Sequence, residues 1–150
     1  MRRFIYSLPV MIAFMTGCIS DEPDMRSLIE VGDRLPDFAI VMNDGETLTT
    51  QMLRGSESLI VLFTTWCPDC RRELPQVQKW ADAHPEVRVA CISRSETAGA
   101  IEALWAEENL TLPWSAQSDA AVYSLFATGG VPRLYLADAD LIVTATDLPW

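Results

Sequence analysis

The feature that most constrains the fold is a continuous apolar run at residues 59–63 that leads into two cysteines at the start of a helical pattern. The run shows no polar alternation, which is typical of a central strand covered on both faces. Over residues 68–83 the period becomes helical, with Leu74, Val77 and Ala81 on one stripe. A buried strand that runs directly into a helix predicts a layered α/β domain.

The rest of the chain alternates between further strand-like and helical patterns. Short strand-like runs at 38–42 and 46–50 flank Asn43-Asp44-Gly45, a sequence typical of a hairpin turn. Three more strands are predicted at 87–92, 133–137 and 141–146, and a helix over 97–108. Asp119 is expected to cap a further short helix that carries three apolar residues and ends at a glycine pair: Val122, Leu125, Phe126 and Gly129-Gly130. This order predicts a single domain with an N-terminal hairpin and a central mixed sheet between two outer layers, α/β/α.

The charge balance excludes one class of partner. The chain has 21 acidic and 11 basic residues, a formal net charge of −10. Because such a surface repels a phosphate backbone, we expect no nucleic-acid binding. A zinc site would need Cys91 and His84 to converge on the cysteine pair, so we expect no metal.

The first 17 residues have the pattern of a secretory signal. Arg2 and Arg3 precede an apolar stretch at 4–15 that is shorter than the roughly 20 residues of a membrane-spanning helix. Followed by Cys18, the segment resembles a bacterial lipoprotein signal in which that cysteine becomes lipidated. The alternative is an uncleaved anchor in which Cys18 is incidental. We predict a signal peptide at 1–17, a lipid anchor and tether at 18–34, a folded domain at 35–150, and a location in the periplasm or cell envelope.

The two cysteines have the spacing of a redox pair. Cys67 falls at the helix N-terminus, where unpaired backbone N–H groups and the helix dipole favour a thiolate. Pro68 suits the first helical position because its missing N–H is not needed there. Two intervening residues, Pro68 and Asp69, let Cys70 reach Cys67 within one turn, so the pair can alternate between dithiol and disulfide with no other cofactor. We expect Cys67 to attack and Cys70 to resolve.

At these residues, Trp66-Cys67-Pro68-Asp69-Cys70, the sequence resembles the thioredoxin superfamily, and more closely its anchored extracytoplasmic thiol-disulfide oxidoreductases of the TlpA/ResA type. The resemblance covers about residues 31–146 and includes Pro75 in the active-site helix. It implies that the loop at Gly130-Val131-Pro132 contains a cis-proline and lies beside the cysteines. The position of Trp66 beside Cys67 favours a surface contact role, and the alternative is simple packing.

The same resemblance implies that Glu73 lies close to the cysteines and tunes their titration. The alternative is a solvated helix residue paired with Arg71 or Arg72. Cys91 falls inside a predicted strand and is expected to be a small buried apolar residue rather than a third redox thiol. Trp80 and Trp105 have helical spacing and are expected in or beside the core.

Three functions remain open. The resemblance favours an oxidoreductase that reduces disulfides of protein substrates and is recharged by a membrane electron donor. A peroxidase is the second alternative, since Thr64-Thr65-Trp66-Cys67 contains the T-x-x-C part of the peroxiredoxin motif, although Ile60 stands where a proline is expected. The third is an anchored module that binds partners or hands over a metal ion without catalysis.

In the thioredoxin fold a further helix follows the closing hairpin, but only four residues follow Thr146. The C-terminal helix is therefore expected to be missing, which would leave Leu141, Ile142 and Val143 poorly covered. We expect compensation in one of two ways. Either Trp150 folds back over the sheet, or the bare face meets a partner chain, for example in a homodimer. The alternative is a truncated gene product of reduced stability.

Overall fold

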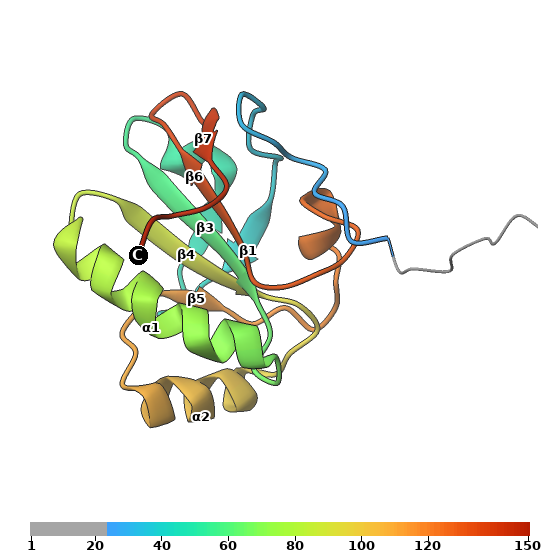
Figure 1. Ribbon diagram of the computed structural model, residues 1–150, viewed down its shortest axis with the longest axis vertical. Coiled ribbons are helices and arrows are strands. Elements are labelled where there is room, and N and C mark those ends of the chain that lie inside the picture. Colours follow the sequence, from blue (N-terminus) through green and yellow to red (C-terminus); the bar gives the residue numbers. More distant parts are fainter. Residues whose placement is uncertain (1–23) are drawn as a thin grey trace, which may run out of the picture.

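The computed structural model describes residues 24–150, which form a central sheet with two α-helices (Figure 1). The predicted signal peptide and the predicted lipidation site at Cys18 lie outside the described residues. No helix among the described residues is long and apolar enough to cross a membrane.

The central sheet has five strands in the order β5-β4-β3-β6-β7. Their bounds are β3 (Ser58–Phe63), β4 (Arg88–Ser93), β5 (Trp114–Ser115), β6 (Arg133–Ala137) and β7 (Val143–Ala145). Strands β3, β4 and β5 are parallel, whereas β6 pairs antiparallel with β3 and β7 pairs antiparallel with β6. The predicted mixed sheet is confirmed, and β5 is a short edge strand that the sequence did not reveal.

Strand β3 is the centre of the core, and every one of its residues is buried. Leu59, Val61 and Phe63 face one side of the sheet, in the cluster that contains the helices. Ile60 and Leu62 face the other side, in the cluster that contains the hairpin. Burial on both faces explains why this strand reads as a continuous apolar run.

Both α-helices pack on the same face of the sheet. They are α1 (Pro68–Ala83) and α2 (Ala98–Glu108), and the bounds of α1 are those predicted. The chain passes from β3 through α1 to β4 and through α2 to β5, always toward the same edge. Because both of these connections between parallel strands have the same handedness, α1 and α2 lie on the same face of the sheet, as Figure 1 shows.

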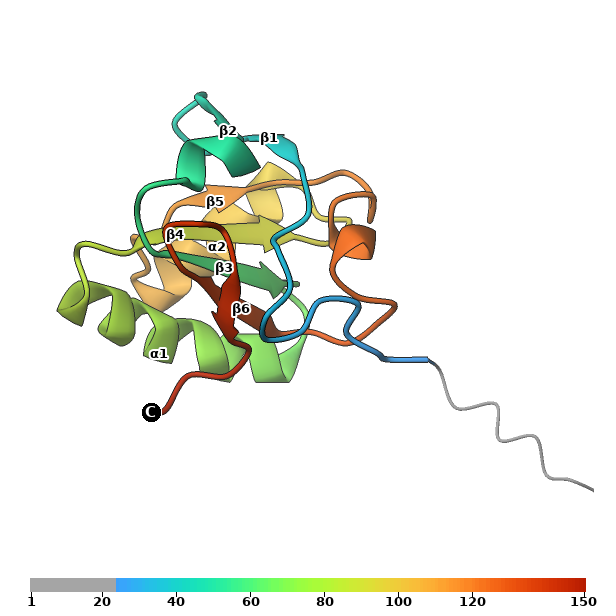
Figure 2. The same ribbon diagram turned by 90° about the horizontal axis from the view of Figure 1, so that it is seen from above.

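The opposite face is covered by the predicted hairpin and two 3-10 helices (Figure 2). These elements are β1 (Ala39–Val41), β2 (Thr47–Thr49), η1 (Thr50–Leu53) and η2 (Tyr123–Leu125). The helix predicted after Asp119 is therefore a single three-residue 3-10 turn. Asp119 accepts a hydrogen bond from the N–H of Ala121, but Leu125 is 41% exposed and does not lie on a buried face.

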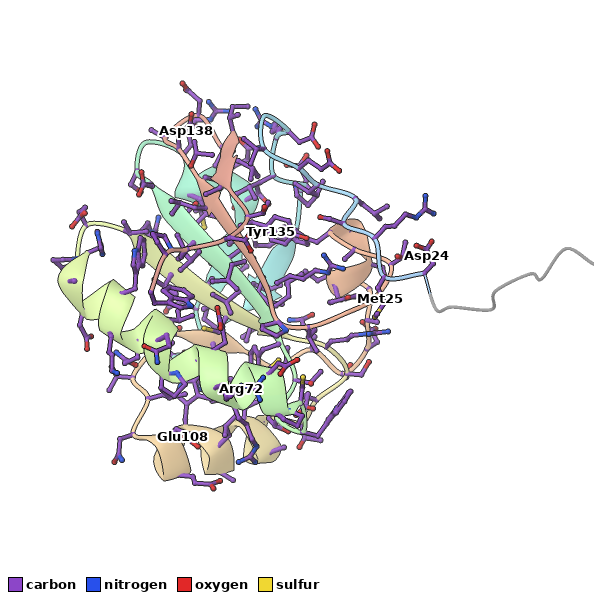
Figure 3. All side chains as sticks on the ribbon, viewed as in Figure 1. Asp24, Met25, Arg72, Glu108, Tyr135 and Asp138 are labelled. Carbon is purple, nitrogen blue, oxygen red and sulfur yellow. The ribbon has the colours of Figure 1, made fainter. Side chains whose placement is uncertain are left out.

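The segment 24–34, predicted to be part of a tether, packs along the domain. Leu28 donates its N–H to the Phe126 carbonyl at 2.7 Å, and Gly32 donates to the Val143 carbonyl at 2.8 Å. Figure 3 shows Asp24 and Met25 beside the loop that leads from η2 to β6. Contacts with the domain therefore begin upstream of residue 35, the predicted boundary.

This segment changes the expectation for the closing strand. Leu141 and Val143 are fully buried in the hairpin-side cluster, and the N–H of Leu35 donates to the Leu141 carbonyl at 2.9 Å. The prediction of poor cover is therefore wrong for Leu141 and Val143, whereas Ile142 is half-buried, and the argument for a homodimer loses most of its apolar surface. Trp150 is 49% exposed, and it is Leu148 that packs against the helix-side cluster.

The close approach of segment 24–34 to Gly129 can be tested by adding one methyl group. A Cβ at Gly129 would lie 3.0 Å from the Asp24 carbonyl oxygen and 3.3 Å from Met25 Cγ. We expect Gly129→Ala to displace the segment, to lower the free energy of unfolding by about 1 kcal/mol, and to speed hydrogen exchange at the amides of Leu28 and Thr128. The control Gly99→Ala adds a methyl group in open space on α2 and should leave this exchange unchanged. Equal exchange in both variants would contradict the packing described.

Candidate redox site

Cys67 lies where the N-terminus of α1 meets the loop before β6. It is the N-cap residue, and its carbonyl accepts the first helical hydrogen bond, from the N–H of Arg71, at 3.1 Å. Its Sγ donates to the carbonyl oxygen of Val131 at 3.6 Å. The Val131-Pro132 peptide bond is cis, as the resemblance implied. The predicted meeting of Cys67 with this loop is therefore present in the structure.

Cys70 lies one turn into α1, and its side chain is fully buried. Both cysteines are free thiols, so the structure describes the dithiol form. Burial raises the pKa of the Cys70 thiol to about 12, while the backbone and the hydroxyl of Thr64 oppose that rise and the neighbouring Cys67 sulfur adds to it. Cys70 is thus a shielded thiol in direct interaction with Cys67, the arrangement expected of a resolving cysteine.

Trp66 projects from the site, with 70% of its surface exposed beside the largely buried Cys67. Pro68 occupies the first turn of α1, as predicted. Asp69 is exposed and pairs with Arg72 one turn later. The surface around the sulfur therefore combines an uncovered indole with a helix start, which suits contact with another molecule more than a closed pocket.

The turn between β3 and α1 is held by side chains from outside the cysteine motif. Arg71 donates its Nε–H to the Thr65 carbonyl at 2.9 Å and pairs with Glu107 of α2 at 3.2 Å. The Thr65 hydroxyl donates to Glu96 at 2.5 Å. These long-range partners fix the turn that presents Cys67.

The loop facing Cys67 is anchored by two residues that the sequence did not single out. The Tyr123 hydroxyl donates to the Gly130 carbonyl at 2.6 Å, and the Arg94 guanidinium lies 4.5 Å from the centre of the Tyr123 ring. Arg133 donates to the Gly129 carbonyl at 3.0 Å. No local pattern marks Tyr123, because its partner becomes adjacent only after the chain has turned back.

Glu73 is half-buried and lines an open cleft of about 630 Å³ together with Pro132. The alternative that pairs Glu73 with Arg71 or Arg72 is wrong, since these arginines pair with Glu107 and Asp69. The cleft also contains other ionisable residues: Glu30, Arg133 and Asp147. A role of Glu73 in tuning the cysteines remains a prediction.

The remaining candidates are Cys91 and His84. Cys91 is fully buried on β4, and burial raises the pKa of its thiol, as suits an inert core residue. His84 stacks on Trp80 at the far end of α1, with 4.2 Å between ring centres. Within residues 24–150, no three His, Cys, Asp or Glu side chains are grouped as metal ligands.

Comparison with known proteins places this geometry in a family. The sequence model of one family, Redoxin, matches residues 30–149. The chain belongs to the Redoxin family. The predicted resemblance to the TlpA/ResA type of the thioredoxin superfamily is thereby confirmed.

Individual relatives agree with the family. The thiol-disulfide oxidoreductase ResA of Oceanobacillus iheyensis is 25% identical over 143 residues, which cover 89% of this chain and 74% of the relative. A putative protein disulfide isomerase from Bacteroides thetaiotaomicron has a TM-score of 0.76 at 23% identity, with 83% of this chain and 82% of that chain covered. A secreted disulfide oxidoreductase of Mycobacterium tuberculosis has a TM-score of 0.66 at 22% identity, with 74% and 84% covered. These two structures share the fold of this Redoxin chain.

The anchoring of the loop by Tyr123 leads to a testable expectation. Tyr123→Phe removes the hydrogen bond to Gly130, which should release the loop from Cys67 and speed alkylation of the Cys67 thiol by iodoacetamide. Loss of this one bond should lower the free energy of unfolding by about 1 kcal/mol. The matched control is Tyr135→Phe, because the hydrogen bonds of the Tyr135 hydroxyl go to Ser27 and Phe126 and not to Gly130. If both variants alkylate at the wild-type rate, Tyr123 does not hold the loop.

Proposed function

We propose that Cys67 and Cys70 are the redox couple of a thiol-disulfide oxidoreductase that reduces disulfides in protein substrates outside the cytoplasm. The observation that carries the proposal is the pair of interacting thiols at the start of α1, with Cys67 against the Val131 carbonyl. The curated relative named ResA supports the same activity. The chain is a thiol-disulfide oxidoreductase, and Cys67, Cys70 and the Val131-Pro132 loop are its proposed site.

The chemistry needs no cofactor beyond the two sulfurs. The Cys67 thiolate attacks one sulfur of a substrate disulfide, whose S–S bond breaks, and the other substrate sulfur leaves as a thiolate and takes up a proton. Cys70, once deprotonated, attacks Cys67 in the resulting mixed disulfide and releases the second substrate sulfur. Two electrons pass to the substrate, and Cys67 and Cys70 become a disulfide. We propose a membrane electron donor for the return to the dithiol.

The reducing direction rests on the resemblance to the anchored extracytoplasmic oxidoreductases of the TlpA/ResA type. A strong oxidant of this kind stabilises its reduced form as a thiolate on the attacking cysteine, which makes the disulfide easy to reduce. A measured reduction potential of the couple tests the direction: a value near or below that of thioredoxin, about −270 mV, supports a reductase. A value near −120 mV would reverse the assignment.

The proposed location rests on the first residues of the chain. The basic start, short apolar stretch and Cys18 form the pattern of a lipoprotein signal. One similar structure is that of a secreted protein. We therefore propose a lipid anchor on Cys18 and a domain in the periplasm or cell envelope. Labelling with a radioactive fatty acid in cells that express wild type or Cys18→Ala tests the anchor, and equal labelling would contradict it.

The two alternatives have separate tests. In a peroxidase the T-x-x-C threonine would serve the attacking cysteine, whereas Thr64 acts here on Cys70. Insulin reduction without peroxide consumption supports the proposed reductase, and peroxide consumption alone supports the peroxidase. A metal hand-over module would bind a thiophilic ion such as Cu(I) in wild type and lose that binding in Cys70→Ser, with no insulin reduction in either.

The order of attack gives a direct prediction. In Cys70→Ser the resolving step is lost, so a mixed disulfide between Cys67 and a protein substrate should accumulate. Mass spectrometry of the trapped adduct identifies the cysteine involved. The double variant Cys67→Ser/Cys70→Ser is the control and should trap nothing, because Cys91 is fully buried. An adduct through Cys91 would contradict the assignment of Cys67 as the attacking thiol.

A further inference from the structure

Two hydroxyl groups in the described part of the chain are buried without a hydrogen-bond partner of ordinary geometry: Ser58 Oγ and Thr64 Oγ1. They lie at opposite ends of β3, since Ser58 is its first residue and Thr64 directly follows its last. A buried hydroxyl without a partner costs free energy, so each requires an explanation. Ser58 lies at the end of β3 that is remote from the cysteines, and Thr64 lies at the end that presents them.

The place of Thr64 brings its hydroxyl to the resolving cysteine. Only Thr65 and Trp66 separate it from Cys67, and its own side chain is 1% exposed. Its backbone and its hydroxyl both act on the Cys70 sulfur in the direction that favours the thiolate. Water does not reach this sulfur, because the Cys70 side chain is fully buried.

The resolving step requires that the negative charge of the Cys70 thiolate be stabilised in the core. Cys70 must lose its proton before it can attack Cys67 in the mixed disulfide, and burial opposes the resulting charge. Within the described residues, no lysine, arginine or histidine has a hydrogen bond or ion pair with Cys70. A hydroxyl donor is the remaining side-chain group that can stabilise the charge, since a hydrogen bond to an ionised acceptor is about twice as strong as a neutral one.

We propose that the Thr64 hydroxyl is held without a partner in the dithiol form so that it can donate a hydrogen bond to the Cys70 thiolate as this thiolate attacks Cys67. In this step the Cys70–Cys67 bond forms as the bond from Cys67 to the substrate sulfur breaks, and the proton that Cys70 loses balances the proton that the departing substrate thiolate takes up. Thr64 keeps its own proton throughout. It is therefore a positioning residue for the resolving step and takes no part in the first attack. This inference rests on the proposed function.

The two chemical steps can be separated with 5,5′-dithiobis(2-nitrobenzoate). Attack by Cys67 on this reagent releases one coloured thiolate, and attack by Cys70 on the mixed disulfide releases a second. In Thr64→Val, which keeps the shape but removes the hydroxyl, we expect the first phase at the wild-type rate and the second phase slower by about tenfold, as for one lost hydrogen bond to a charged group. Thr64→Ser restores a hydroxyl and should restore the second phase.

Ser58→Ala is the matched control, because it removes the unpartnered hydroxyl at the opposite end of β3 and should change neither phase. An unchanged second phase in Thr64→Val would overturn the inference, and so would equal slowing of both phases. Should Thr64→Val fail to fold, Thr64→Ala against Thr64→Ser makes the same comparison. Absence of a second phase in wild type would instead contradict the proposed redox couple itself.

Discussion

The burial of β3 on both faces is the interaction on which the rest of the structure depends. Because every residue of this strand is buried, its end is fixed relative to both layers of the core. The chain leaves β3 at Phe63 and enters α1 at Pro68, so the start of the helix is fixed as well. The positions of the proposed attacking and resolving sulfurs therefore depend on that strand. Their different environments follow from one helical turn, which takes the chain from Cys67 beside the Val131 loop to the fully buried Cys70.

The bounds of α1 and the central position of β3 could be predicted from the sequence, because the residue patterns that determine them are local. The stripe of apolar residues and the proline at the first position predict both ends of α1, and the continuous apolar run predicts β3 as the central strand. The prediction for Leu125 is wrong for the same reason. A local pattern predicts a helix with Leu125 on its apolar face, but the structure forms a single 3-10 turn in which Leu125 is exposed.

What the sequence could not reveal depends on partners far apart in the chain. The Arg71 side chain pairs with Glu107 of α2, and this choice of partner is decided by the packing of two helices. Segment 24–34 lies along residues about 100 positions later, and many of its hydrogen bonds join backbone groups, which leave no side-chain pattern. The sequence also does not reveal the roles of Tyr123 and Thr64, because each side chain acts on a group that only folding brings near: the Gly130 carbonyl and the Cys70 sulfur. The contact between Cys67 and the Val131 loop was expected from family resemblance and not from any local pattern.

The contacts of Arg133 have a mechanical consequence. Its guanidinium donates at once to the Met25 carbonyl at 2.5 Å and to the Gly129 carbonyl, and Thr128 bonds the backbone of Asp24 and Arg26. A pulling force applied to the chain at Asp24 therefore acts first on the bonds to Thr128 and Arg133. These two residues lie on either side of Val131, whose carbonyl accepts the hydrogen bond from the Cys67 sulfur. Tension on the start of the domain is thus delivered within a few residues of the redox site.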